Sequence, residues 1–372
     1  MRLRDLPAYL RDTVLRMFPH RAPTGFVRIG EPGRGSPVLV TGNFTLTVRR
    51  LRDALRGRDA WLLVANSRGI NVWCASGGGY LTHHSIISAI RTSGIEALVD
   101  HREVILPQLC ATGVERRRIT EATGFDARWG PARLEDLPAF LERGARVHKD
   151  ERLMRFPAWE RMEMAAMWAV PMLVIGLPIL ALAGDPVVAA AAGAAVAALV
   201  FGLFALLPWL EVQGRTRFVT FAGFAAGAAL LGCGALLALG AATPAHAATV
   251  AGSSLVAMAI LSVDLAGTTP WYGSYINTFR NEARVELVQE RCSGAAECVQ
   301  VCPRDVLHMN GRRRKVEIRN PGQCIQCGAC IVQCPEDALR FHYEDGRIVE
   351  APTIRRTRMN LLGRRRVEVQ QE

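Results

Sequence analysis

Seven of the ten cysteines in this 372-residue chain lie between residues 292 and 334. The second run follows the frame C-x2-C-x2-C-x3-C-P, with Cys324, Cys327, Cys330 and Cys334. The first run keeps the same frame with Cys292, Cys298 and Cys302, but has Ala295 where the second cysteine would stand. This spacing is typical of bacterial two-cluster ferredoxins. It predicts an α+β ferredoxin domain in a compartment that keeps thiols reduced.

In such ferredoxins the fourth cysteine of each run ligates the other cluster. The rule predicts a complete [4Fe–4S] site from Cys324, Cys327, Cys330 and Cys302. The second site would hold Cys292, Cys298 and Cys334 and lack a fourth thiolate. It could bind [3Fe–4S], or [4Fe–4S] with a non-cysteine ligand, or stay an empty loop. A zinc ribbon or a disulfide framework are the alternatives, although zinc usually takes two C-x2-C pairs.

The middle third of the chain has a different composition from its flanks. Residues 163–270 contain only 2 of the 45 basic residues and 4 of the 34 acidic ones. Apolar stretches cover 164–183, 187–209, 218–241 and 246–265, each close to the ~20 residues that cross a bilayer as helix. We expect a four-helix transmembrane bundle rather than a buried soluble helical core. Its abundant small residues favour close helix packing in lipid.

Loop charges orient this bundle. Arginines and a lysine precede the first stretch, the middle loop carries Arg215 and Arg217, and Arg280 and Arg284 follow the last stretch. The other two loops have neither residue type. The positive-inside rule then predicts a multi-pass protein of the inner (cytoplasmic) membrane with both termini cytoplasmic. The net charge of +11 fits anionic lipid, and no groove-reading motif suggests nucleic acid.

The first third of the chain alternates β-branched and helical patterns. Strands are predicted at 37–41, 60–64, 71–73, 97–99 and 104–106, and helices at 45–57, 82–93, 114–124 and 135–143. This pattern indicates an α/β sheet, whose ligands lie at the carboxyl ends of its strands. The segment 69–79 places Cys74 beside three glycines that let a flat cofactor approach the backbone. A thiolate there could ligate a transition metal, or Cys74 could be a small buried hydrophobe.

The stretch Asn71-Val72-Trp73-Cys74-Ala75 resembles the cap-helix signature of the corrinoid protein of microbial mercury methylation, HgcA. The stretch 101–109 and the motifs Arg155-Phe-Pro157 and Gly267-Thr-Thr-Pro270 are similar to that family as well. The segment 37–43 also resembles the large subunit of the corrinoid iron–sulfur protein. The C-terminal region is similar to HgcB, the ferredoxin partner of HgcA. The chain thus resembles a fusion of both partners.

The resemblance implies three domains. These are a Rossmann-like corrinoid-binding domain (1–150), a transmembrane domain (151–270) and a ferredoxin domain (271–372). It implies that Cys74 coordinates cobalt from the lower face of a cobalamin-type corrinoid and that Asn71 holds the cap helix. The residues expected to contact the corrinoid are Asn71, Val72, Trp73, Cys74, Ala75, Ser76, Gly77, Thr41 and Asn43.

Two features depart from the family pattern. Its signature continues Ala-Ala-Gly-Lys, whereas this chain has Gly78 in place of the lysine, and the tail 361–372 has no cysteine. Cys110 stands where the family tends to have glycine, either as a substitute thiol or as a packing residue.

We expect a membrane-bound, corrinoid-dependent methyltransferase. It would take a methyl group from a donor protein or a methylfolate-type donor, and inorganic mercury is one candidate acceptor. An external low-potential donor would supply electrons through the clusters. The alternatives are a redox module that reduces or holds a corrinoid without its own methyl transfer, and a plain membrane electron carrier.

Overall fold

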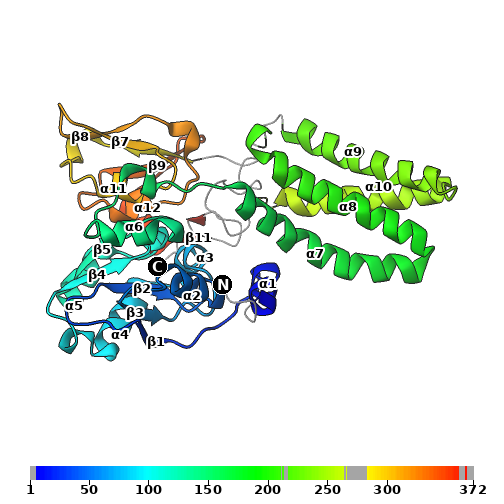
Figure 1. The fold of residues 1–372 in the computed structure, drawn as a ribbon. Helices are drawn as coiled ribbons and strands as arrows, with labels where there is room; N and C mark the ends of the chain where they lie inside the picture. The colour runs from blue at the N-terminus through cyan, green and yellow to red at the C-terminus, as the bar shows by residue number, and fades with distance from the viewer. Residues whose placement is uncertain are drawn as a thin grey trace, which may run out of the picture.

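The computed structural model describes residues 6–210, 212, 217–263, 265, 283–359 and 365–366. Two α/β units lie side by side and form a head, and a bundle of four long helices projects from it (Figure 1). A short helix, α1 (Leu6–Val14), packs against the first bundle helix beside the head. The bundle therefore adjoins the N-terminal part of the chain.

The N-terminal unit is built on a five-stranded sheet in the order β1-β3-β2-β4-β5. Strands β2, β3, β4 and β5 are parallel, and β1 pairs antiparallel with β3. The strand bounds are Gly25–Ile29 (β1), Val38–Gly42 (β2), Ala60–Ala65 (β3), Glu103–Leu106 (β4) and Asp126–Trp129 (β5). This order confirms the predicted α/β class with crossover connections.

Both faces of this sheet are buried, as parallel sheets require. On β3, Trp61 and Leu63 point into one hydrophobic cluster, and Leu62 and Val64 point into the other. Helices α3, α4 and α5 cover the first face, and α2 and α6 cover the second. Their bounds are Thr45–Ala54 (α2), Val72–Gly77 (α3), His83–Ser93 (α4), Arg116–Thr123 (α5) and Leu137–Glu142 (α6).

Two predicted strands are wrong. The stretch 71–73 enters helix α3, because the Asn71 side chain accepts a hydrogen bond from the Cys74 backbone N–H and caps a helix there. The stretch 97–99 follows a turn of 3-10 helix that begins after Gly94 in a left-handed conformation. Strands β1 and β5 were not predicted, since β1 is an antiparallel edge strand and β5 carries the exposed Arg128 among its four residues.

The bundle contains helices α7 (Ala158–Ala183), α8 (Pro186–Leu206), α9 (Arg217–Ala238) and α10 (Pro244–Val263). All four are long and apolar enough to cross a membrane. This confirms the four predicted apolar helices, within a few residues at each end. Asp264, near the end of the last predicted stretch, lies outside the described residues.

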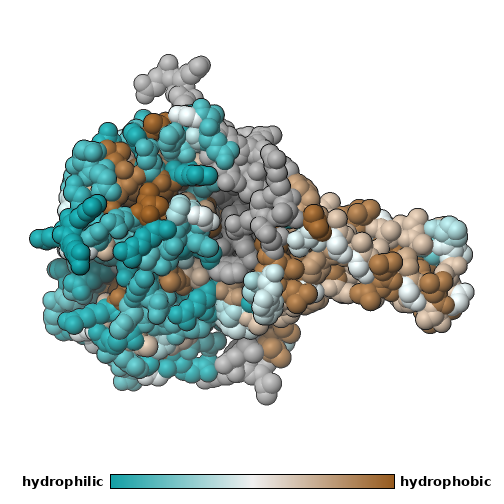
Figure 2. Space-filling view, turned by 90° about the horizontal axis from the view of Figure 1, so that it is seen from above, coloured by the Kyte–Doolittle hydropathy of each residue, from teal (hydrophilic) through white to brown (hydrophobic). Residues whose placement is uncertain are grey.

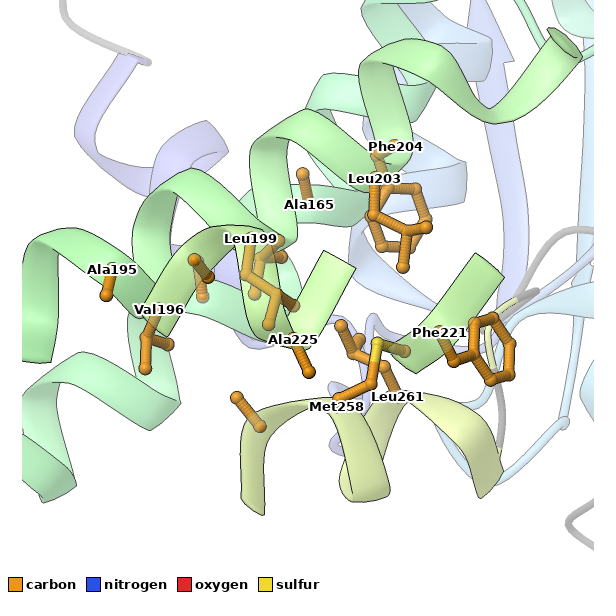
Figure 3. Packing of buried hydrophobic residues seen from close by; sticks show 14 of the residues in the cluster. Ala165, Ala195, Val196, Leu199, Leu203, Phe204, Phe221, Ala225, Met258 and Leu261 are labelled. Carbon is orange, nitrogen blue, oxygen red and sulfur yellow. The ribbon is translucent and has the colours of Figure 1, made fainter. Parts of the chain in front are cut away.

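The bundle core is built from small and medium-sized apolar residues. Ala195, Leu199 and Leu203 of α8 face Ala225 and Leu261 of the neighbouring helices (Figure 3). The exterior is apolar too, and forms the brown surface to the right in Figure 2. One end is closed by Arg161 of α7, whose guanidinium donates to the carbonyl oxygens of Phe204 and Phe156 at 2.9 and 2.8 Å. It therefore caps the last turn of α8.

The ferredoxin unit is small and carries both cysteine runs. A three-stranded sheet has the order β10-β9-β6, and the hairpin β7-β8 separates the two runs. The bounds are Ala283–Leu287 (β6), Leu307–Asn310 (β7), Lys315–Ile318 (β8), Leu339–Tyr343 (β9) and Ile348–Val349 (β10). Helices span Glu297–Val301 (α11), Ala329–Gln333 (α12) and Ala351–Arg356 (α13). A final pair joins Arg358–Met359 (β11) to Arg365–Arg366 (β12).

Candidate cofactor and cluster sites

A cavity of about 210 Å³ opens at the carboxyl ends of the central strands. The chain passes from β2 to β3 on one side and then returns across β2 to β4 on the other side. The crevice between β2 and β4 is therefore the topological switch point, where open α/β sheets bind ligands. Thr41 ends β2 on this cavity, and Leu106, Pro107 and Gly130 line it from the ends of β4 and β5.

Helix α3 closes this cavity and carries Cys74. Asn71 is its N-cap, with Oδ1 accepting from the Cys74 N–H at 3.0 Å. Val72 and Ala75 are buried, whereas Cys74 is half-buried. The helix is held from behind by the 3-10 segment η3 (Gln108–Thr112). A Cβ on Gly113, directly after η3, would lie 2.0 Å from the Ser76 carbonyl oxygen, so only glycine permits this packing.

The residues predicted to contact a corrinoid fall into two groups. Thr41, Asn71, Val72 and Trp73 line the cavity. Cys74, Asn43, Ala75, Ser76 and Gly77 do not line it; Cys74 is half-buried and the other four are buried.

The second group supports the site from behind. The Asn43 side chain accepts from the N–H groups of Ser67 and Gly69 at 2.8 and 2.9 Å, and so shapes the loop before α3. The Ser76 hydroxyl bonds to that of Thr112 at 2.8 Å and so fastens α3 to η3. These residues position the cap helix.

The donor set fits a corrinoid. Cys74 presents a soft, half-buried thiol on the short helix α3. Asn71, Val72 and Trp73 at the start of this helix line the cavity at the switch point, and Cys74 itself does not. Ligand pockets usually reach about 300 to 1,000 Å³. The 210 Å³ cavity is therefore large enough for only part of a macrocycle, and the remainder would lie over the half-buried side of α3.

Sequence reasoning missed a charged rim around the cavity. Arg16, Arg50, Arg133 and Glu160 line it. Glu160 belongs to the first turn of α7 and pairs with Arg133 at 3.0 Å. The cofactor cavity and the bundle therefore share a wall. The sequence contains no local signal for this, because each partner is an ordinary charged residue in its own segment.

Thiols of the two cysteine runs lie close enough to influence one another. Burial raises the pKa of Cys330, and the thiols of Cys302, Cys327, Cys324 and Cys298 raise it further. Burial, with the thiols of Cys334 and Cys292, raises the pKa of Cys298 to about 12. Cys302 of the first run therefore lies near the second run, and Cys334 of the second run lies near the first. The division of the seven cysteines between two clusters stays a prediction of the ferredoxin rule.

No three His, Cys, Asp or Glu side chains among the described residues converge as a single metal ion requires. None of the ten cysteines, all of which are described, forms a disulfide.

Cys110 and Cys233 are placed away from both groups. Cys110 is fully buried in the core beside η3, and burial raises the pKa of its thiol. Cys233 packs half-buried against the bundle core. Both positions suit packing, and neither thiol is an exposed nucleophile.

The ferredoxin unit is docked directly on the back of the cap helix. The buried Gln333 amide donates to the carbonyl oxygens of Ala111 and Val114 at 2.8 and 2.7 Å. The Gln108 amide donates to the Gln300 carbonyl oxygen at 3.2 Å in the opposite direction. Cys327 packs in the same hydrophobic cluster as Val72 and Ala75. Of the four cysteines predicted to hold the complete cluster, Cys327 therefore lies in the core behind α3.

Residues 16–141 match the family described as CO dehydrogenase/acetyl-CoA synthase delta subunit. Residues 284–335 match the 4Fe-4S dicluster domain. The chain thus combines a domain of a corrinoid-subunit family with a ferredoxin-like dicluster domain. These matches support the resemblance to the corrinoid iron–sulfur protein and do not show the fusion of mercury-methylation proteins.

Among curated proteins, the chain is similar to gamma subunits of the acetyl-CoA decarbonylase/synthase complex. It is 35% identical over 135 residues to that of Methanopyrus kandleri, covering 36% of this chain and 29% of the relative. The Archaeoglobus fulgidus subunit is 32% identical over 127 residues, with 34% and 27% covered. Subunit gamma 2 of Methanosarcina mazei is 34% identical over 120 residues, with 31% and 25% covered. The chain spans less than a third of these relatives.

Proposed function

We propose that this protein binds a corrinoid at α3 and transfers a methyl group from it, using electrons supplied by its own ferredoxin domain. The observation that carries this proposal is the placement of Cys74. It lies half-buried on a cap helix at the switch point, and Cys327 of the predicted complete cluster packs in the hydrophobic core behind the same helix. The match of residues 16–141 to a corrinoid-subunit family supports it.

The roles of the residues follow from this geometry. Cys74 would be the lower cobalt ligand, while Asn71 and Ser76 fix the helix that presents it. Trp73 and Thr41 would contact the macrocycle. When bound, the corrinoid supplies the cobalt that carries the methyl group, and the protein supplies binding, orientation and ligand tuning.

Electron supply would run from an external low-potential donor through the clusters to the α3 site. Cys324, Cys327, Cys330 and Cys302 would hold [4Fe–4S]. Cys292, Cys298 and Cys334 would hold [3Fe–4S] or a [4Fe–4S] with a non-cysteine ligand. Because η3 contacts both α3 and α12, it would connect the complete group to the helix that carries Cys74. A fused donor makes this delivery effectively intramolecular.

We further propose that the four bundle helices span the cytoplasmic membrane, with both termini in the cytoplasm. Their length, their apolar exterior and the loop charges support this topology. A methyl-donor protein or a methylfolate-type donor would then load the site from the cytoplasm. Inorganic mercury is the candidate acceptor that the resemblance suggests.

The test is the variant Cys74→Ala, purified without oxygen and loaded with methylcobalamin. We expect a shifted visible spectrum of the bound corrinoid and at least a hundredfold slower methyl loss to added inorganic mercury. Cys233→Ala in the bundle is the matched control and should behave like the unaltered protein. An unchanged spectrum and rate in Cys74→Ala would refute the thiolate role.

A second candidate function is a membrane redox module that reduces or holds a corrinoid for another methyltransferase. The glycine at position 78 favours it, since the lysine of the mercury-methylation pattern is missing there. It predicts electron delivery to the bound corrinoid in single-turnover experiments without methyl transfer to mercury or to thiols. Methyl transfer by the purified chain alone would exclude it.

A further inference from the structure

A second cavity between the N-terminal unit and the ferredoxin unit has a cationic lining. Its volume is about 340 Å³, and it lies beside β5, the edge strand of the sheet. Arg116, Arg128, Arg152, Trp129 and Gln300 contribute to its wall. None of the described residues that line it is acidic. The N-terminal unit, the ferredoxin unit and the connection toward the bundle all meet here, because Arg152 belongs to that connection.

Trp129 brings an unused hydrogen-bond donor to this cavity. The residue is only 5% exposed, and within the described part of the chain its buried Nε1 has no hydrogen-bond partner. Buried side-chain donors in proteins nearly always have a partner, either protein, water or ligand. The indole N–H can only donate. The missing partner must therefore be an acceptor.

Arg152 brings a cation without a counterion. Its Nη1 reaches the Val299 carbonyl oxygen at 3.5 Å, and its buried Nε has no partner among the described residues. Within that same part of the chain, no carboxylate lies in ion-pair range of it. The other two arginines differ, since Arg116 pairs with Glu297 at 2.5 Å and Arg128 pairs with Glu103 at 2.7 Å. Among the residues that the structure describes, no carboxylate therefore compensates the positive charge of Arg152.

We propose that this cavity is an oxyanion site for a phosphate group. Two of the residues that line this cavity have a buried side-chain nitrogen without a hydrogen-bond partner among the described residues. These are the Arg152 guanidinium and the Trp129 indole, and both can only donate. Guanidinium groups match phosphate oxygens in charge and in geometry, and each can offer two parallel N–H groups. Arg116, Arg128 and the Gln300 amide add further donors to the wall. A carboxylate ligand would suit the site less, because it has fewer acceptor oxygens for this many donors.

The site joins separate parts of the chain. Trp129 and Arg128 come from β5, Arg152 comes from the connection to α7, and Gln300 comes from α11 of the ferredoxin unit. A bound phosphate would therefore crosslink the docked ferredoxin to the sheet. Phosphate binding is thus expected to stabilise the docked arrangement by linkage.

Two sources of phosphate fit the position. One is free inorganic phosphate or a phosphate monoester from solution. The other is the phosphodiester in the nucleotide tail of a corrinoid, because Gly130 lines both this cavity and the cofactor cavity. The second source rests on the proposed function, whereas the first does not.

The experiment uses the full chain in nanodiscs, prepared without oxygen, and measures inorganic phosphate binding by calorimetry before any corrinoid is added. The variants Arg152→Gln and Trp129→Phe should each weaken phosphate binding by about tenfold or more. Arg117→Gln is the matched control, since Arg117 is exposed and pairs with Glu121 in the next turn of α5. Circular dichroism verifies that all variants keep their helix content.

A second arm compares cobalamin with cobinamide, which lacks the nucleotide and its phosphate. If the tail is the source, Arg152→Gln weakens cobalamin binding about tenfold and leaves cobinamide binding unchanged. Phosphate binding lost in the first arm supports the free-phosphate source even if no corrinoid binds at all. Two results together overturn the proposal. Inorganic phosphate binds to none of the proteins or to all of them equally, and Arg152→Gln changes the binding of cobalamin and of cobinamide by the same factor.

Discussion

The two cysteine runs share one backbone and differ in what they face. Helices α11 and α12 both have five residues and both begin after a residue with positive φ, Ala296 or Gly328. In each run the sulfur of the last cysteine accepts a hydrogen bond from the backbone N–H four residues further on. Val306 donates to Cys302 at 3.4 Å, and Ala338 donates to Cys334 at 3.3 Å. The local fold therefore does not depend on the missing cysteine.

The second position of the cysteine frame is Cys327 in one run and Ala295 in the other, and its surroundings differ between the two runs. Cys327 is buried in the core shared with the cap helix. Ala295, its counterpart, is exposed on a cavity of about 430 Å³ that Arg116, Arg118 and Glu115 line. The frame therefore has a cysteine, Cys327, on the side where the ferredoxin unit packs in the core of the cap helix, here called the core side. It has none at position 295, on the side of the charged cavity, here called the charged side. The comparison suggests that the complete group delivers electrons and that the other group receives them.

The largest expected effect comes from removing the thiol on the core side. Cys327→Ala should leave three thiolates in each group and abolish electron transfer to a bound corrinoid, with a loss of at least a hundredfold. Stopped-flow reduction of the corrinoid by dithionite-reduced clusters measures this. Cys292→Ala is the control on the charged side and should slow the entry of electrons while leaving the last step intact. If both variants slowed the reduction of the bound corrinoid equally, the two cysteine groups would not differ in function.

Restoring the thiol on the charged side is the converse change. Ala295→Cys should raise the iron content from about seven to about eight per chain, if the second site holds [3Fe–4S]. The paramagnetic signal of an oxidised [3Fe–4S] cluster should disappear. Because Ala295 is exposed and α11 keeps its conformation, the variant should fold normally. Ala296→Cys, one residue away, is the matched control and should leave iron content unchanged.

Docking on the core side depends on one buried amide. Gln333→Leu leaves the carbonyl oxygens of Ala111 and Val114 without their donor, which should cost about 3 kcal/mol of stability. We expect earlier thermal unfolding and slower electron transfer to the cofactor site. The exposed Gln323→Leu is the control and should change unfolding by less than about 0.5 kcal/mol. A wild-type transfer rate in Gln333→Leu would show that docking does not limit transfer.

The smallest effect is a pH dependence on the charged side. Burial, with the charges of His84 and Arg118, lowers the pKa of His83 to about 4. Its unfolded value is about 6.5. Between these values the unfolded chain binds a proton that the folded one does not, so stability falls as pH falls from about 6.5 to 4. The loss should reach about 1 to 2 kcal/mol at pH 5. Denaturant titrations at pH 7.5 and 5 measure it, and His83→Gln should flatten that slope.

Part of the site could be read from local patterns. The β-branched runs predicted β2, β3 and β4 closely. The cysteine frame predicted the 4Fe-4S dicluster domain that residues 284–335 match. The pattern failed at Val72-Trp73, whose strand preference is outweighed by the Asn71 cap and by the close packing that Gly113 allows. Local propensity is a weak guide wherever a cap and a tertiary contact act together.

The docking and the charged cavities had no sequence signal. Gln333 is one of several glutamines near the cysteines, and Arg152 is one of many arginines in its third of the chain. Their roles appear only because Gln333 meets Ala111, 222 residues earlier, and because Trp129 ends an edge strand there.

The sequence by itself determined the iron–sulfur frame and the four apolar helices. Both depend on residue spacing and composition within short segments, which no distant contact can change. Only the tertiary structure decided which cysteine packs in the core behind the cap helix. It also decided which cavity is lined by Arg152, an arginine without a carboxylate partner among the described residues. Those outcomes come from packing between segments far apart in the chain, where the loss of a few buried hydrogen bonds outweighs any local preference.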